Sequence, residues 1–216
     1  MITTTRLLLA AGIAAGATGA AAAQDHRDPT AWKGAKGWRA VMDQPAPDSL
    51  LFSVDMPPGW HITAHGPGAL LDDTSWRSAG VATVEAEIFL FPSSTEREYG
   101  LFVGGSGLES GSPAWMGVLL RRDGSWAVAR GHGSSLEMIR DWTPNAAINP
   151  AGAQAVKNVL SVSLDAGRVT VRVNGVAVGD AALPSPDAAD GAVGIRVGPG
   201  LNLHVTRVTI TSGKGG

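Results

Sequence analysis

Glu85 and Glu87 are the residues whose type and spacing come closest to catalytic chemistry. They lie two positions apart in the segment VEAEIFLF, and residues two apart in an extended strand point to the same face. Two carboxylates on one face can lie about 5 to 5.5 Å apart, as a retaining glycosidase requires, and their repulsion would raise one pKa to suit a general acid. The pair could equally be two solvated carboxylates on the polar side of an amphipathic strand.

A second group of candidates lies in GWHITAHG, residues 59–66. Alternation along a strand puts Trp60 on one face and both His61 and His65 on the other. The two histidines would be about 13 Å apart along the chain, too far to share a metal ion. We therefore expect no metal site from this pair. The imidazoles are instead candidates to hydrogen-bond a hydroxyl-rich ligand or the neighbouring strands.

Aromatic and basic side chains supply the remaining candidates. Seven tryptophans accompany one tyrosine, and indole rings stack on the C–H faces of sugars while their N–H groups donate hydrogen bonds. Trp60 and Trp126 could serve in this way, or could close the ends of the core. Arg121 could bind the carboxylate of an acidic sugar in a bidentate manner or be a surface charge. His204 could face the ligand or be a structural histidine.

The elements that must position these residues are predicted to be strands. From Leu50 onward the apolar residues alternate with period two, and the segments are closed by Gly, Pro, Asn or Asp. Hairpin turns are expected at 123–124, 165–167 and 174–175, the last an Asn-Gly dipeptide suited to positive φ at both positions. The pattern predicts an all-β fold, a two-sheet antiparallel β-sandwich of the jelly-roll type over residues 50–211. A polar segment, 24–49, precedes it and a tail, 212–216, follows.

The first residues and the composition limit the classes of function. Residues 1–23 have the layout of a secretory signal peptide, so we expect an exported protein, periplasmic or extracellular, with no membrane span after cleavage. Removal of Arg6 leaves 16 of the 17 basic side chains against 19 acidic ones, which argues against a nucleic-acid partner. The absence of cysteine excludes disulfides and thiolate chemistry.

The order of the motifs resembles that of a known superfamily. GWHITAHGPGALL, VEAEIFLF, YGLFVGG, MGVLLRRDGSWAVAR, NVLSVSLDAGRVTVRVNG and DGAVGIRVGPGLNLHVTRVTI follow one another as in concanavalin A-like lectins and glucanases, most closely the 3-keto-disaccharide hydrolase-like or glycoside-hydrolase-16-like domains. The resemblance implies a concave sheet that meets a saccharide. It also implies a structural calcium ion, for which Asp72, Asp73 and Asp190 are conceivable ligands. No other cofactor is expected.

Three functions remain open at this stage. The first is an exported domain that binds carbohydrate on its concave sheet. The second is a glycoside-active enzyme, a glycoside or 3-keto-glycoside hydrolase, that uses Glu85 and Glu87. The sequence has only these two of the three carboxylates in the strand motif of family-16 glucanases. The third is a structural or interaction domain of the cell envelope, and the oligomeric state is left open.

Overall fold

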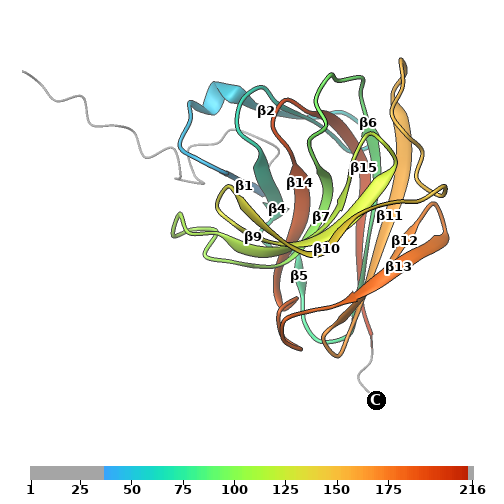
Figure 1. The fold of residues 1–216 in the computed structure, drawn as a ribbon. Coiled ribbons are helices and arrows are strands. Elements are labelled where there is room, and N and C mark those ends of the chain that lie inside the picture. Colours follow the sequence, from blue (N-terminus) through green and yellow to red (C-terminus); the bar gives the residue numbers. More distant parts are fainter. Residues whose placement is uncertain (1–36, 214–216) are drawn as a thin grey trace, which may run out of the picture.

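The computed structural model describes residues 37–213, which form two packed antiparallel sheets (Figure 1). The eight-stranded sheet has the order β1-β4-β14-β7-β8-β9-β10, with β5 paired to β14. Its strands are β1 (Trp38–Met42), β4 (Ala69–Asp73), β5 (Arg77–Ser78), β7 (Tyr99–Ser106), β8 (Ala114–Leu120), β9 (Ser125–His132), β10 (Ser135–Pro144) and β14 (Gly191–Val197).

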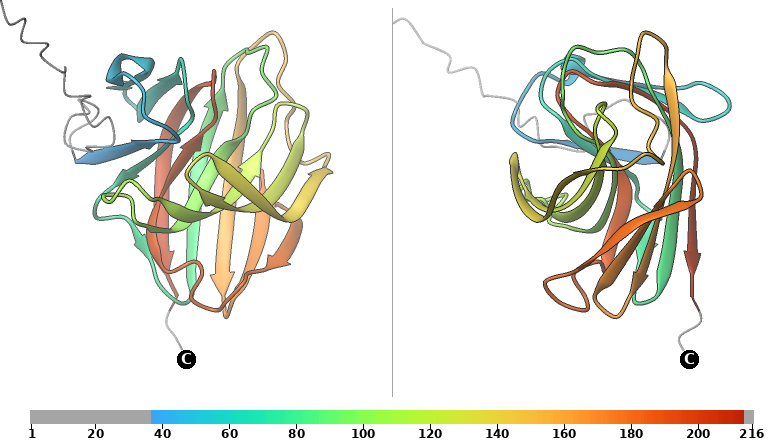
Figure 2. Two further views of the ribbon diagram at one scale, coloured as in Figure 1. Left: turned by 60° about the vertical axis from the view of Figure 1, so that its left-hand side comes forward. Right: turned by 45° about the vertical axis from the view of Figure 1, so that its right-hand side comes forward.

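The seven-stranded sheet has the order β13-β12-β11-β6-β15-β3-β2. Its strands are β2 (Leu51–Asp55), β3 (Trp60–Ala64), β6 (Ala82–Leu90), β11 (Val156–Asp165), β12 (Arg168–Val173), β13 (Val176–Ala182) and β15 (Asn202–Ser212). The right-hand view of Figure 2 shows the layers apart, with yellow-green β9 and β10 on the left and β6, β11 and β15 on the right. The predicted β-sandwich is therefore confirmed.

The core lies between the sheets and follows the period-two pattern. In β6 every second residue from Ala82 to Leu90 is buried, and Val169, Val171 and Val173 of β12 face the same interior. The polar residues between them face outward. Burial of these two inner faces is the main source of stability in a chain that has no disulfide.

The hairpin turns have the geometry that their residues favour. Asn174 and Gly175 join β12 to β13 with φ of 52° and 82°, and Ala166 and Gly167 join β11 to β12 with φ of 44° and 78°. Positive φ at both central positions matches the right-handed twist of the strands. These two turns lie where the sequence predicted hairpins.

Two segments outside the strands complete the described chain. Trp38–Met42, within the polar segment expected to precede the sandwich, forms β1 and pairs with β4, so the sandwich includes residues before Leu50. Asp48–Leu50 forms η1, a single turn of 3-10 helix. Within residues 37–213, no helix has the length and apolar character needed to cross a membrane. The predicted signal peptide lies outside the described residues.

Candidate functional site

Glu85 and Glu87 share the outer face of the seven-stranded sheet, where both are paired. Glu85 accepts a hydrogen bond from Arg207 at 3.2 Å, and Glu87 accepts bonds from Thr206 at 2.8 Å and Lys157 at 3.3 Å. The bond from Thr206, followed by Lys157, holds the pKa of Glu87 below its ordinary value. A general acid needs a raised pKa, so the environment of Glu87 is the opposite of what the catalytic hypothesis requires.

The predicted histidines are partly brought together. His61 of β3 lies directly opposite His204 of β15, with ring centroids 6.2 Å apart, on the outer face of the seven-stranded sheet. His65 follows β3 in an exposed turn. Burial, and then the nearby His204, lower the pKa of His61, so its imidazole is favoured in the neutral form.

The tryptophans predicted to contact sugar point into the sandwich. Trp60 packs in a cluster with Trp38 and Trp76, at centroid distances of 4.7 and 6.2 Å, against the core. Trp126 is 0% exposed and belongs to the same core. The prediction that Trp126 stacks on a ligand is therefore wrong, because its ring has no exposed surface. These aromatics close the core instead.

Arg121 lies on the other sheet from the carboxylates and histidines. It follows β8, and its guanidinium stacks 3.7 Å above the ring centre of Trp142 of β10. Glu85, His61 and His204 are outside the seven-stranded sheet, whereas Trp142 packs on the outside of the eight-stranded sheet. The residues singled out from the sequence therefore do not form one site.

The outer face of the eight-stranded sheet carries a second buried cluster, which we call the hollow face. Its buried apolar members are Val41, Leu70, Phe102, Leu108, Trp115, Leu119, Ala129 and Ala192, with Leu136, Met138 and Trp142 packed against them. The Trp115 ring lies on Gly131, where an added Cβ would come within 2.0 Å of it, so only glycine fits there. This outer face therefore has a buried apolar cluster of its own, to which the loop between β7 and β8 contributes Leu108.

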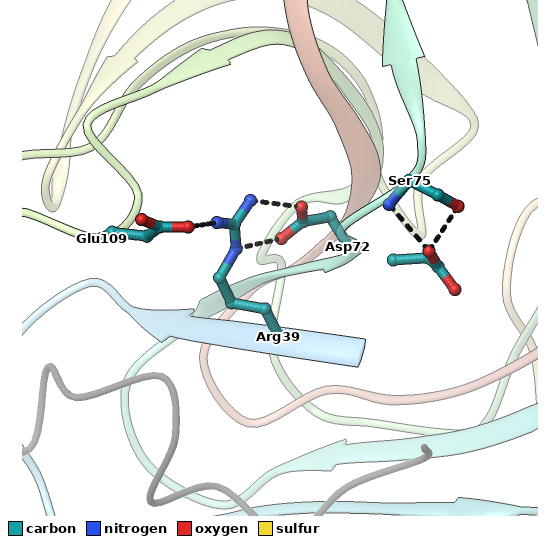
Figure 3. A network of polar contacts seen from close by, with 5 residues as sticks. Arg39, Asp72, Ser75 and Glu109 are labelled. Carbon is teal, nitrogen blue, oxygen red and sulfur yellow. Dashed lines mark hydrogen bonds and ion pairs between the residues drawn. The ribbon is translucent and has the colours of Figure 1, made fainter. Parts of the chain in front are cut away.

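Arg39 anchors one polar cluster on this face (Figure 3). Its Nε and Nη2 donate to the two carboxylate oxygens of Asp72 at 3.0 and 2.6 Å, and its Nη1 donates to Glu109 at 2.6 Å. Arg39 and Asp72 are cross-strand partners on β1 and β4, and Glu109 comes from the loop between β7 and β8. Asp72 is 1% exposed, and its burial raises its pKa although Arg39 opposes the shift.

Arg196 of β14 anchors a second cluster of the same kind. Its guanidinium donates to both oxygens of Asp43, at 2.5 and 2.8 Å, and to Glu98 at 2.8 and 3.2 Å. The side chains of Arg196, Glu98 and Asp43 are 3%, 7% and 9% exposed. The guanidinium also lies 5.3 Å from the ring centre of Trp115. Two arginines with bound carboxylates are thus buried on an outer face.

A depression opens beside each cluster. The first has a volume of about 280 Å³, and its lining includes Arg39, Arg77, Ser106, Leu108, Glu109 and Ser110. The second, of about 190 Å³, is lined in part by Asp43, Arg97, Glu98, Leu136 and Arg196. Each combines cationic donors, anionic acceptors and apolar surface, a combination that suits a polar organic ligand.

The three aspartates considered for calcium do not fit such a site. Both oxygens of Asp72 are bound by Arg39 (Figure 3). Asp73 accepts two bonds from Ser75, and Asp190 accepts a bond from the Gly80 amide. Across residues 37–213, no group of three or more His, Asp or Glu side chains is arranged to hold a metal ion.

Sequence reasoning missed Arg39, Glu98 and Arg196, and it considered Asp72 only as a calcium ligand and not as the partner of Arg39. The available signal was an arginine or aspartate at an alternating position within an apolar strand, as in WRAVM, ALLDD and GIRVG. Alternation shows that such a residue faces away from the core. Only the strand order shows that these outward positions meet on one sheet.

Comparison with known proteins supports the fold. The sequence matches no protein-family model and no curated protein. The structure is similar to the carbohydrate-binding module CBM66 from Bacillus subtilis, with a TM-score of 0.61 and 13% identity over 82% of this chain and 96% of that one. A Bacillus subtilis protein of unknown function with a galectin-like fold gives a TM-score of 0.56 at 13% identity, over 82% and 90% of the two chains.

A family 7 alginate lyase, A1-II′, gives a TM-score of 0.51 at 10% identity, over 79% and 85% of the two chains. Identities this low bear on architecture rather than activity. The chain has the concanavalin A-like sandwich fold.

Proposed function

We propose that the protein is an exported carbohydrate-binding domain and that the hollow face is its binding surface. The observation that carries this proposal is the pair of buried arginine–carboxylate clusters, Arg39 with Asp72 and Glu109, and Arg196 with Asp43 and Glu98, each beside a depression. The shared fold of a carbohydrate-binding module agrees with it.

The chemistry of the first depression suits sugar hydroxyl groups, which both donate and accept hydrogen bonds. The bonds of Arg39 use three of its five N–H donors, so two remain without a partner among residues 37–213. Glu109, with a side chain 77% exposed, offers carboxylate oxygens at the rim. Leu108 and Ala192 also line this depression.

Stability alone is a weak explanation for these clusters. Burying a charge costs several kcal/mol, and apolar side chains of similar volume often stabilise a protein as well as a buried ion pair does. The outer face of a sheet needs no such charges, as the largely apolar remainder of the hollow face illustrates. Hydrogen bonding of a ligand to the accessible atoms of each cluster would explain why charged side chains lie there.

The spacing of the two clusters favours an oligosaccharide. Arg39 pairs with Asp72 of β4, and Leu70, two residues before Asp72, pairs with Arg196 of β14. Two strand spacings across the sheet and two residues along it place the arginine Cα atoms about 12 Å apart. One sugar ring cannot reach both depressions, whereas a short chain of sugars can.

Glycan-array screening followed by calorimetry tests the proposal. Glu109→Gln keeps the size of the side chain and removes the charge, and we expect it to weaken binding about tenfold, as for one lost charge-assisted hydrogen bond. Glu87→Gln, on the opposite sheet, is the matched control and should bind as the unchanged protein does. Equal affinity in all three proteins, or loss only in Glu87→Gln, would place the ligand elsewhere.

The enzymatic alternative predicts a different result. Release of reducing sugar that is abolished by Glu85→Gln or Glu87→Gln would establish a glycoside hydrolase on the other sheet. The ion pairs of both residues and the lowered pKa of Glu87 argue against this outcome. Failure of every glycan to bind or to raise the melting temperature would favour a structural role.

A further inference from the structure

We propose that His61 and His204 form a binding site for a divalent transition metal ion, with Zn²⁺ as the best match. The site lies on the outer face of the seven-stranded sheet and is independent of the carbohydrate proposal. The two residues are 143 positions apart in the sequence and direct cross-strand partners in the sheet.

The hydrogen bonding of His204 prepares one of its nitrogens as a ligand. Its Nε2 is 3.0 Å from the carbonyl oxygen of Pro58. Because a carbonyl can only accept, Nε2 carries the proton and Nδ1 of the neutral ring holds a lone pair. A backbone carbonyl that receives the second N–H is the usual support of a metal-binding histidine, since it fixes both the tautomer and the ring.

The free nitrogens of the pair have no competing partner. Nδ1 of His61 and Nδ1 of His204 are both buried, and neither has a hydrogen-bond partner among residues 37–213. Buried imidazole nitrogens without partners are uncommon, because each costs free energy.

The separation of the rings permits a shared ion. A nitrogen lies about 1.15 Å from the imidazole centre, and a Zn–N bond is about 2.0 to 2.1 Å, so two rings on one ion have centres at most about 6.5 Å apart. The observed 6.2 Å is within that limit, and a closer approach of about 1 Å would give a tetrahedral angle at the metal.

Apolar rings and one polar side chain surround the two imidazoles. Phe91 lies 5.3 Å from the His61 ring and Phe89 lies 6.2 Å from the His204 ring, so apolar rings flank the pair. Asn202 is on the same face of β15, and its buried Oδ1 has no partner among residues 37–213. It is available to accept a hydrogen bond from one of the two waters that, with the two imidazoles, would complete a four-coordinate site.

Calorimetric titration of the full chain with ZnCl₂ at about pH 7.5 tests the proposal. We expect one Zn²⁺ per chain and a higher melting temperature with zinc. His61→Ala should weaken binding at least tenfold. His61 makes no hydrogen bond within residues 37–213, so this change removes a ligand without breaking a bond.

Histidines elsewhere are the matched controls. His65→Ala and His132→Ala remove exposed imidazoles of the described chain, and His26→Ala removes the one outside it; all three should bind zinc as the unchanged protein does. His204→Ala should match His61→Ala, with circular dichroism to confirm the fold. Undiminished binding in His61→Ala, loss of binding in a control, or no binding at about 1 mM Zn²⁺ would overturn the proposal.

Discussion

Removing the Arg196 guanidinium should destabilise the protein strongly, because two carboxylates depend on it. In Arg196→Met the side chains of Asp43 and Glu98, 9% and 7% exposed, would remain in place without a cation. Breaking a buried ion pair from one side typically costs about 3 to 5 kcal/mol. For a domain of this size, a loss of that magnitude lowers the melting temperature by roughly 6 to 20 °C.

Arg207→Met is the matched control on the other sheet. Arg207 also binds a glutamate, Glu85, at 3.2 Å, but its side chain is 61% exposed. An exposed pair of this kind contributes about 0 to 1 kcal/mol, so the control should unfold close to the unchanged protein. Urea titration followed by tryptophan fluorescence measures the free energy of unfolding of each variant. The m-value shows whether the same amount of surface is exposed on unfolding.

A third variant separates charge from packing. Replacing Arg196, Asp43 and Glu98 together by Met, Leu and Leu removes the buried charges as a group, and such replacements are often neutral or stabilising. We therefore expect it to recover most of the loss. Equal stability of Arg196→Met and Arg207→Met would refute this reasoning.

Three further predictions concern other parts of the fold. Asn158 is fully buried and bonds to Tyr99, Asn149 and Asn174, so Asn158→Leu should cost about 3 kcal/mol in urea unfolding, and a cost below that of Arg207→Met would contradict its role. Burial raises the pKa of Tyr99 to about 12, and Tyr99 is the only tyrosine, so ultraviolet titration should detect no tyrosinate near pH 10.0 in the folded protein. The stability that the raised pKa of Tyr99 contributes is present below pH 10.0 and is lost as pH rises toward about 12. Glu87 has a lowered pKa, so its contribution to stability is present above about pH 4.5 and is lost as pH falls further. Glu87→Gln should remove this acid dependence in unfolding measurements. An unchanged dependence of stability on pH in the variant would contradict the prediction.

The fold could be predicted from the sequence because its signals are local. Alternation in the segments that became β6, β11 and β12 identified the buried face of each strand, and Asn174-Gly175 marked a hairpin. β1 was not predicted, because Trp38–Met42 is a short apolar run inside a polar, proline-containing segment. Its strand geometry comes from pairing with β4, which is not local information.

The candidate site could be predicted only in part, because alternation gives the face of a strand but not the sheet. Glu85 in β6 and Arg121 after β8 were considered for one surface, yet the chain changes sheets between β6 and β7 and places them on opposite sides. Trp126 follows a turn, where a shift of one residue decides between interior and surface. Arg39 and Asp72 are 33 positions apart, and only the β1–β4 register brings them together.

The final strand of the described chain lies within a sheet rather than at its edge. β15 is inserted between β6 and β3, so that Thr209 pairs with Glu85 and Leu203 pairs with Ile62. Contacts between such distant residues form slowly, because a long loop must close before they contribute. During synthesis the sandwich therefore stays open until nearly all of these residues have left the ribosome. Until then β6 and β3 present unpaired edges, which other chains could join.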